Sequence, residues 1–437
     1  MLKNKEIFYN YKAKFFPIKF FMLYFVYTFI IFLVSDAASE ILNFYDLLFY
    51  VTSFYSFLFL GYWLGVKSKK ITRKDLYSVK LQKKLIFIGA IYFVAWGVNL
   101  LVDFGATDFS QVLRTLISPG EAYQNKFDIF EGRELSGQVN RVTQILLLLS
   151  FVSSIFIILL VLNWRRISFS LKIFSVFSIL IYVVSYLFIG TQKGVGDVII
   201  YFLVGVFLLL ANGYKVSAKK KFFIITLIVI VFSSMFVYMV INQGLRATVF
   251  GQNSNVLFKE IHNTAISKYF NEETAFGFYN TISYPSHGYL GLSYNLQQNF
   301  EFSSGAGLSP AYESYRAQYF GGTGNLPITY PFRTEVATGW PAGMYWATAF
   351  PWFASDLTFP GTIIFMFIIG FIFARTWIRA ISQKDILAYA LLGQIFIMMF
   401  YLPANNQVFM QRQGFLIILS IIILAIFREF RKKKYYV

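Results

Sequence analysis

Hydrophobic residues in this chain gather into long runs separated by short polar turns. We read ten of these runs as transmembrane helices, because a mainly apolar stretch of about 20 residues matches the hydrocarbon thickness of a bilayer. In chain order the predicted helices cover about 20–34, 47–66, 85–102, 145–162, 173–189, 198–211, 224–241, 359–374, 386–402 and 415–427. The pattern therefore predicts an all-α polytopic membrane protein.

One long polar stretch, 242–358, interrupts this pattern late in the chain. It is rich in Gly, Tyr, Asn and Pro, and it contains no apolar run long enough to cross a bilayer. We predict that it forms one large periplasmic loop. It would divide the chain into seven helices (1–241), the loop (242–358), and three helices with a basic cytoplasmic tail (359–437).

The distribution of charge tests this map independently, because the helices were placed from hydropathy alone. Of the 39 Lys and Arg residues, the map places 28 on the cytoplasmic side, as the positive-inside rule requires. Both termini are then cytoplasmic. The net charge of +18 follows from topology, so it does not indicate nucleic-acid binding, and the inner bases are expected to face anionic membrane lipids.

Composition supports a membrane protein and excludes several kinds of site. Hydrophobic residues make up 57% of the chain and charged residues 14%, with a mean hydropathy of +0.58. Cysteine is absent, which excludes disulfides, thiolate metal sites and a cysteine nucleophile. The sequence contains no H-E-x-x-H, Walker or D-x-D motif, so we expect no metal and no cofactor.

Basic residues on the predicted outer side are candidates for phosphate binding, because the positive-inside rule disfavours them there. Arginine can grip phosphate oxygens through two donors and keeps its charge when partly desolvated. The candidate diphosphate-binding residues are Arg246, Arg316, Arg333, Lys193, Arg141 and Arg412. The alternative is that each pairs with a nearby acid, such as Glu313 or Glu335, and only stabilises the loop.

Four residues of the large loop are candidate catalytic groups. His287 follows a turn-forming Pro-Ser pair, and an imidazole suits general-base work near neutral pH. Glu313, Glu335 and Asp356 are the other candidates. For each, an ordinary structural or interfacial role is the alternative.

Three tryptophans, Trp340, Trp346 and Trp352, could stack on sugar rings, although interfacial aromatic belts are common in membrane proteins. His262 lies in a stretch with the character of an amphipathic surface helix, which favours a structural role.

Two segments resemble a known family. The run A-T-G-W-P-A-G-M-Y-W-A-T-A-F-P-W-F-A-S-D-L-T-F-P-G, which leads into a glycine-bearing helix, and the turn I-G-T-Q-K-G-V-G-D resemble elements of the Wzy-type O-antigen or capsular repeat-unit polymerases. The number of helices and the large late loop with its arginines are also similar to that family.

The resemblance implies a block transfer at the outer face of the bacterial inner membrane. A glycan on undecaprenyl diphosphate would be the donor, and a single lipid-linked repeat unit would be the acceptor. A chain-length regulator protein is an expected partner. Lys193 matches the family's short G-x-x-K-G element, and Arg246 and Arg333 match its loop arginines in kind, whereas a base at His287 is suggested by chemistry alone.

Two alternatives remain. An O-antigen ligase shares the overall organisation and differs in its acceptor. A flippase or other transporter of lipid-linked oligosaccharides is less favoured, because the predicted map puts no charged residue deep inside the first seven helices and transport pathways usually need such residues.

Overall fold

A computed structural model describes residues 11–68, 76–118, 140–213, 218–249, 267–321 and 324–434, with isolated positions between 120 and 132. Throughout these residues the secondary structure is helical, and they contain no strand. His262 lies outside the described residues, as does the side chain of Arg246. The predicted all-α class is confirmed.

A helix occupies each of the ten segments predicted from hydropathy. These helices are α1 (Tyr11–Leu33), α2 (Phe44–Lys67), α3 (Val79–Asp103), the pair α6 (Arg141–Leu148) and α7 (Phe151–Asn163), α8 (Phe169–Phe188), α9 (Lys193–Ala211), α10 (Ala218–Val249), α15 (Phe350–Gln383), α16 (Ile386–Tyr401) and α18 (Arg412–Lys434).

Seven of these helices are long and apolar enough to cross a membrane, and the α6–α7 pair, bent by 55°, makes a possible eighth. Helix α16 is apolar but only 16 residues long. The described helices therefore indicate a membrane protein with seven or eight spans, and the count of ten remains a prediction.

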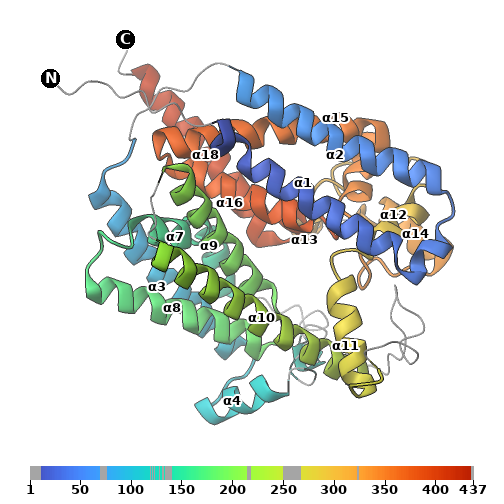
Figure 1. The fold of residues 1–437 in the computed structure, drawn as a ribbon, viewed down its shortest axis with the longest axis horizontal. Coiled ribbons are helices and arrows are strands. Elements are labelled where there is room, and N and C mark those ends of the chain that lie inside the picture. Colours follow the sequence, from blue (N-terminus) through green and yellow to red (C-terminus); the bar gives the residue numbers. More distant parts are fainter. Residues whose placement is uncertain are drawn as a thin grey trace.

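The helices lie against one another in a bundle (Figure 1). They pack through small residues and aromatic rings. Gly61 and Gly65 of α2 lie directly against the backbone of α15, where a Cβ atom at Gly61 would sit 1.9 Å from the Phe367 carbonyl oxygen. Such close approach is typical of helix pairs in membranes. Phe21 of α1 meets α16 with a ring-centroid distance of 5.0 Å to Phe396, which places an edge-to-face aromatic cluster in the core.

Contacts join segments that the charge pattern assigns to one side. On the predicted inner side, buried Asp385 caps the start of α16 and pairs with Arg379 at 3.0 Å and Arg428 at 2.7 Å. Helix α1 begins and α18 ends at this same end of the bundle (Figure 1). On the predicted outer side, the Tyr294 hydroxyl donates to Glu40 at 3.2 Å. These contacts agree with the predicted alternation of helix direction.

The predicted large loop contains several short helices. They are α11 (Glu272–Ser283), α12 (Gly288–Asn295), α13 (Pro310–Phe320), the 3-10 turn η3 (Leu326–Ile328) and α14 (Tyr330–Thr338). Outside the loop, the short elements are η1 (Asp36–Glu40), α4 (Phe109–Ile117) and α17 (Gln407–Met410).

Three helix ends differ from the sequence prediction. Helix α10 continues through Val249, so Arg246 lies on the helix and not beyond its end. Helix α15 begins at Phe350, breaks at Thr358 with a φ of 64°, and continues past Pro360, so the predicted start at 359 coincides with the second part of this helix. Helix α9 begins at Lys193, five residues before the predicted start at 198.

Candidate functional site

The outer end of α9 carries a buried ion pair. Gly190, with a φ of 63°, ends α8 and turns the chain, and Gly194 lets the first turn of α9 approach the Tyr186 ring so closely that a Cβ atom would lie 2.3 Å from it. Lys193 and Asp197, in the first two turns of α9, are four residues apart and lie on the same face of the helix. The Lys193 Nζ lies 2.7 Å from Asp197 Oδ2.

The other oxygen of this carboxylate is unsatisfied. Asp197 is 6% exposed, and its Oδ1 atom is buried and has no hydrogen-bond partner among the described residues. Buried polar atoms are nearly always paired, because an unpaired one loses its hydration without compensation. The Asp197 Oδ1 atom is therefore positioned to receive a donor from a bound molecule.

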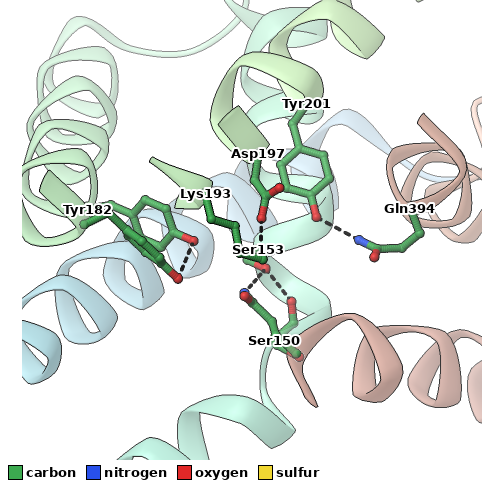
Figure 2. A network of polar contacts seen from close by, with 9 residues as sticks. Ser150, Ser153, Tyr182, Lys193, Asp197, Tyr201 and Gln394 are labelled. Atoms are coloured by element: carbon green, nitrogen blue, oxygen red, sulfur yellow. Dashed lines mark hydrogen bonds and ion pairs between the residues drawn. The ribbon is translucent and has the colours of Figure 1, made fainter. Parts of the chain in front are cut away.

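Polar side chains from four helices surround the pair (Figure 2). Tyr201, one turn further along α9, accepts a hydrogen bond at 2.8 Å from the Gln394 amide of α16. A small cleft of about 10 Å³, room for about one water molecule, is lined by Lys193, Asp197, Tyr201, Gln394, Ile397, Gln407, Val408, Gln411, Gln413, Gly414 and Ile417. Carboxylate, phenol and amide groups of this kind suit the hydroxyls of a sugar.

Two helix N-termini meet at this cleft. Lys193 opens α9, and Gln413 and Gly414 belong to the first turn of α18. Unpaired backbone N–H groups give a helix N-terminus a partial positive charge, which favours anions. The Lys193 ammonium is 25% exposed. The cleft therefore contains an accessible cation in addition to the partial positive charges of the two helix N-termini.

The bend between α6 and α7 brings a further polar group to α18. Ser153, in the first turn of α7, donates to the Ser150 carbonyl at 2.7 Å and accepts a hydrogen bond from the Gln413 amide at 3.4 Å. Figure 2 shows these serines close to the Lys193 side of the network. The bend thus holds one of the cleft glutamines in place.

Two of the predicted diphosphate-binding arginines make several contacts within the outer region. Arg333 uses all three nitrogens: it donates to the Ile328 carbonyl, to Glu301 and to the Asn299 carbonyl at 2.9, 2.8 and 2.6 Å. Arg316 binds both oxygens of Glu313, which also accepts from the Asn325 N–H. These hydrogen bonds lower the pKa of Glu313. The observed contacts match the structural alternative for both arginines.

Arg412 and Arg141 differ from these two. Arg412 donates to the Ser314 hydroxyl at 2.6 Å and lies 5.0 Å from the Tyr315 ring centroid, and none of its contacts with the described residues is to a carboxylate. It stands in the α18 turn that also carries Gln413. Arg141 is exposed at the start of α6.

The predicted acidic catalytic residues hold the outer loop together. Asp356 accepts hydrogen bonds from the Ser303 hydroxyl and from the Gly305 and Leu308 backbone N–H groups, at 2.7, 2.8 and 2.7 Å. Glu335 accepts from the Ala342 N–H at 3.2 Å. A catalytic role for either residue stays a prediction.

His287 sits in a buried aromatic cluster. It is 8% exposed, its ring stacks on Trp346 at 5.2 Å, and its Nε2 accepts the Trp346 backbone N–H at 3.2 Å. Burial lowers the pKa of His287 to about 4. The imidazole is therefore neutral at pH 7, and the lone pair that a base would use is already occupied.

The predicted sugar-binding tryptophans differ in how far they are buried. Trp340 and Trp352 are buried, at 8% and 3% exposure, whereas Trp346 is partly exposed. Trp346 also touches the Tyr401 ring, with centroids 6.2 Å apart. The Tyr401 hydroxyl in turn lies 3.8 Å from the position of a Cβ atom at Gly196, so this cluster reaches the first turns of α9.

Sequence reasoning identified Lys193 but missed Asp197, Tyr201 and Gln394. The i, i+4 spacing of Lys193 and Asp197 is present in the sequence. It predicts an ion pair only if the helix begins at Lys193. No signal marked Tyr201 or Gln394, since each reads as an isolated polar residue in an apolar helix. In the part of the chain that the structure describes, no group of three His, Cys, Asp or Glu residues could hold a metal ion.

Comparison of the chain with protein-family models, with curated proteins and with solved structures gives no match.

Proposed function

We propose that this protein is a membrane glycosyltransferase that polymerises undecaprenyl-diphosphate-linked oligosaccharide repeat units at the outer face of the bacterial inner membrane. The growing glycan on its lipid diphosphate is the donor, and a single lipid-linked repeat unit is the acceptor. The product is an O-antigen or capsular polysaccharide.

The observation that carries this proposal is the polar cleft at the outer end of α9. It combines the Lys193 cation, two helix N-termini, the buried Asp197 carboxylate and four glutamines at the end of an apolar helix. A substrate with a lipid tail, a diphosphate and sugar hydroxyls presents groups complementary to these. The cleft thus supports a lipid-linked saccharide as the ligand.

The proposed reaction depends mainly on electrostatic stabilisation of its transition state. A diphosphate is a good leaving group, so a fixed cation and oriented backbone dipoles near its oxygens lower the barrier as negative charge develops. Lys193 and the start of α9 supply these groups, and Arg412 on the first turn of α18 adds a cation on a helix that also lines the cleft.

A strain that lacks this protein provides the first test. Deletion is expected to reduce the ladder of surface glycans to one repeat unit, and wild type is expected to restore it. Lys193→Ala at normal membrane abundance is expected not to restore it, whereas Lys268→Ala, on the predicted outer side but outside the cleft, should do so. A full ladder in the deletion strain would refute the proposal.

Transport of a lipid-linked oligosaccharide is the second candidate, favoured by the buried Lys193–Asp197 pair. Ionisable residues within membrane helices often mark transport pathways, and this pair lies in the first two turns of a candidate span. The same deletion separates the two functions. Loss of a transporter leaves no repeat unit at the cell surface, whereas loss of a polymerase leaves single units there.

The ligase alternative predicts a third phenotype. Long glycans would accumulate on the lipid diphosphate without reaching the final surface acceptor.

A further inference from the structure

We propose that Asp197 is the general base for the acceptor hydroxyl and that diphosphate binding activates it by drawing Lys193 away. This inference rests on the proposed glycosyl transfer. It assigns the proton-accepting role to a residue of the membrane helices and not to the outer loop.

Asp197 has one oxygen without a partner in the described part of the chain. Asp197 Oδ2 holds Lys193, while Oδ1 is buried without a partner in the described part of the chain. A substrate hydroxyl would supply the missing donor, and a base must lie within hydrogen-bond distance of the proton that it takes. The carboxylate lines the cleft, which has room for about one water-sized group, so a single hydroxyl of a sugar at its mouth can reach Asp197.

The two partners of the ion pair are unequally buried. Asp197 is 9% exposed in its side chain and Lys193 is 25% exposed, so the lysine lies nearer to the open end of the cleft. An ammonium on a flexible four-carbon stem can change partner, and it has two further donors beyond the one used by Asp197. A diphosphate at the α9 N-terminus would compete for it with at least two negative charges against one.

Exchange of partner frees the carboxylate. Once Lys193 turns to the diphosphate, Asp197 Oδ2 loses its hydrogen bond, and both oxygens of the carboxylate can accept from the acceptor hydroxyl. The other titratable groups close enough to influence Asp197 are Tyr182 and Tyr186 of α8, Tyr201 of α9 and Tyr401 of α16. A phenol is ordinarily neutral near pH 7, so among the described residues Lys193 is the one charged group that faces Asp197.

The acceptor hydroxyl oxygen forms a bond to the donor's anomeric carbon as the bond from that carbon to the diphosphate oxygen breaks. The electron pair of the broken bond leaves with the diphosphate, where Lys193 faces it. The hydroxyl proton passes to the Asp197 carboxylate and is later released to water.

The test uses the full-length purified protein and the lipid-linked repeat unit extracted from the deletion strain. Asp197→Asn is expected to reduce kcat at least about 100-fold, the usual scale for loss of a general base, with binding of the lipid-linked unit changed less than about threefold. Lys193→Gln should weaken that binding instead. Asp46→Asn, at an exposed acid near the start of α2, is the matched control and should leave both quantities unchanged.

The double variant Lys193→Gln with Asp197→Asn separates catalysis from charge balance. Because Lys193→Gln weakens binding, kcat is compared at saturating concentrations of the lipid-linked unit. If Asp197 only neutralises Lys193, removing both charges should restore kcat relative to Asp197→Asn, and that result would overturn the inference. A base is not replaced in this way, so we expect the double variant to be no more active than Asp197→Asn. Thermal unfolding checks that each variant is folded.

Asp197→Glu keeps a carboxylate, so it is expected to retain part of the rate that Asp197→Asn loses. If Asp197→Asn lost activity only through misfolding, the rate would not depend on the carboxylate in this way. An active wild type with an equally active Asp197→Asn variant would refute the base alone. A wild type that forms no polymer from lipid-linked units would refute the proposed function itself.

Discussion

At the scale of single residues, His287 shows how burial decides protonation. The imidazole is enclosed by Tyr284 and Trp346, and it accepts a backbone hydrogen bond in its neutral form. Protonation would remove this acceptor and place a charge in an apolar cluster. The residue is thus suited to hold the outer loop in one conformation at neutral pH.

Its low pKa predicts a loss of stability in acid. The pKa of His287 is lowered from 6.5 to about 4 by burial, so between these values the unfolded chain binds a proton that the folded protein does not. The stabilising contribution is complete above pH 6.5, decreases as the pH falls, and by pH 4 has lost about 3 kcal/mol. Melting temperatures of wild type and His287→Gln should therefore converge between pH 7.5 and 4.5. Parallel curves would contradict this account.

Arg333 provides a second test at this scale. Two of its three hydrogen bonds tie α14 to the segment 299–301, through Glu301 and the Asn299 carbonyl, and the third goes to the Ile328 carbonyl of η3. We expect Arg333→Ala to destabilise the outer region by about 1–3 kcal/mol through its unpaired partners, seen as faster proteolysis of this loop. Glu301→Ala, which removes one contact, should have a smaller effect. An Arg333→Ala protein of normal stability that binds the lipid-linked unit weakly would instead support its predicted diphosphate role.

At the scale of helices, the α2–α15 interface depends on glycine. A Cβ atom at Gly61 would lie 1.9 Å from the Phe367 carbonyl oxygen, and one at Gly370 would lie 2.0 Å from the Leu58 carbonyl oxygen. Backbone atoms cannot move aside without separating the helices.

Gly61→Ala should therefore lower the free energy of unfolding by about 1–3 kcal/mol, the usual cost of overpacking. Gly343→Ala is the control, because a Cβ atom there meets nothing within 4 Å. Thermal unfolding in detergent would measure both, and equal stability of the two variants would contradict the packing argument.

Helix positions could be predicted from the sequence, whereas helix ends could not. Long apolar runs must be helical in a bilayer, since backbone groups there have no water to bind, and each predicted run is helical. The ends depend on local partners. Helix α9 begins at Lys193 because its first turn packs on Tyr186 and carries the ion pair to Asp197, and neither contact is visible from hydropathy.

The candidate site was predictable only in part, for the same reason. The G-T-Q-K-G turn indicated Lys193 as a candidate. Gln394 and Gln407, however, come from elements about 200 residues further along the chain, and they reach α9 only through tertiary folding. The acids and arginines of the outer loop were sensible candidates by type. Most of them, such as Asp356 and Glu313, make several contacts inside the loop that only its fold discloses.

At the scale of the whole molecule, the absence of cysteine permits a direct test of topology. Each introduced cysteine is the only thiol in the protein. Ser39→Cys and Tyr269→Cys are exposed positions on the predicted outer side, and Asn212→Cys is an exposed position on the predicted inner side. In intact cells a membrane-impermeant maleimide should label the first two, whereas Asn212→Cys should react only after permeabilisation. The reverse pattern would invert the map.

The early start of α9 has a consequence for how deep the cleft lies. At 1.5 Å per residue, the 14 steps from Asp197 to Ala211 span about 21 Å, whereas the hydrocarbon core of a bilayer is about 30 Å thick. If Ala211 stands at the inner boundary, the carboxylate lies about 9 Å below the outer one, and any helix tilt places it deeper. A lipid-anchored sugar would then reach the cleft from within the outer leaflet of the membrane. The thickness of the membrane would determine how much water enters the cleft with the sugar.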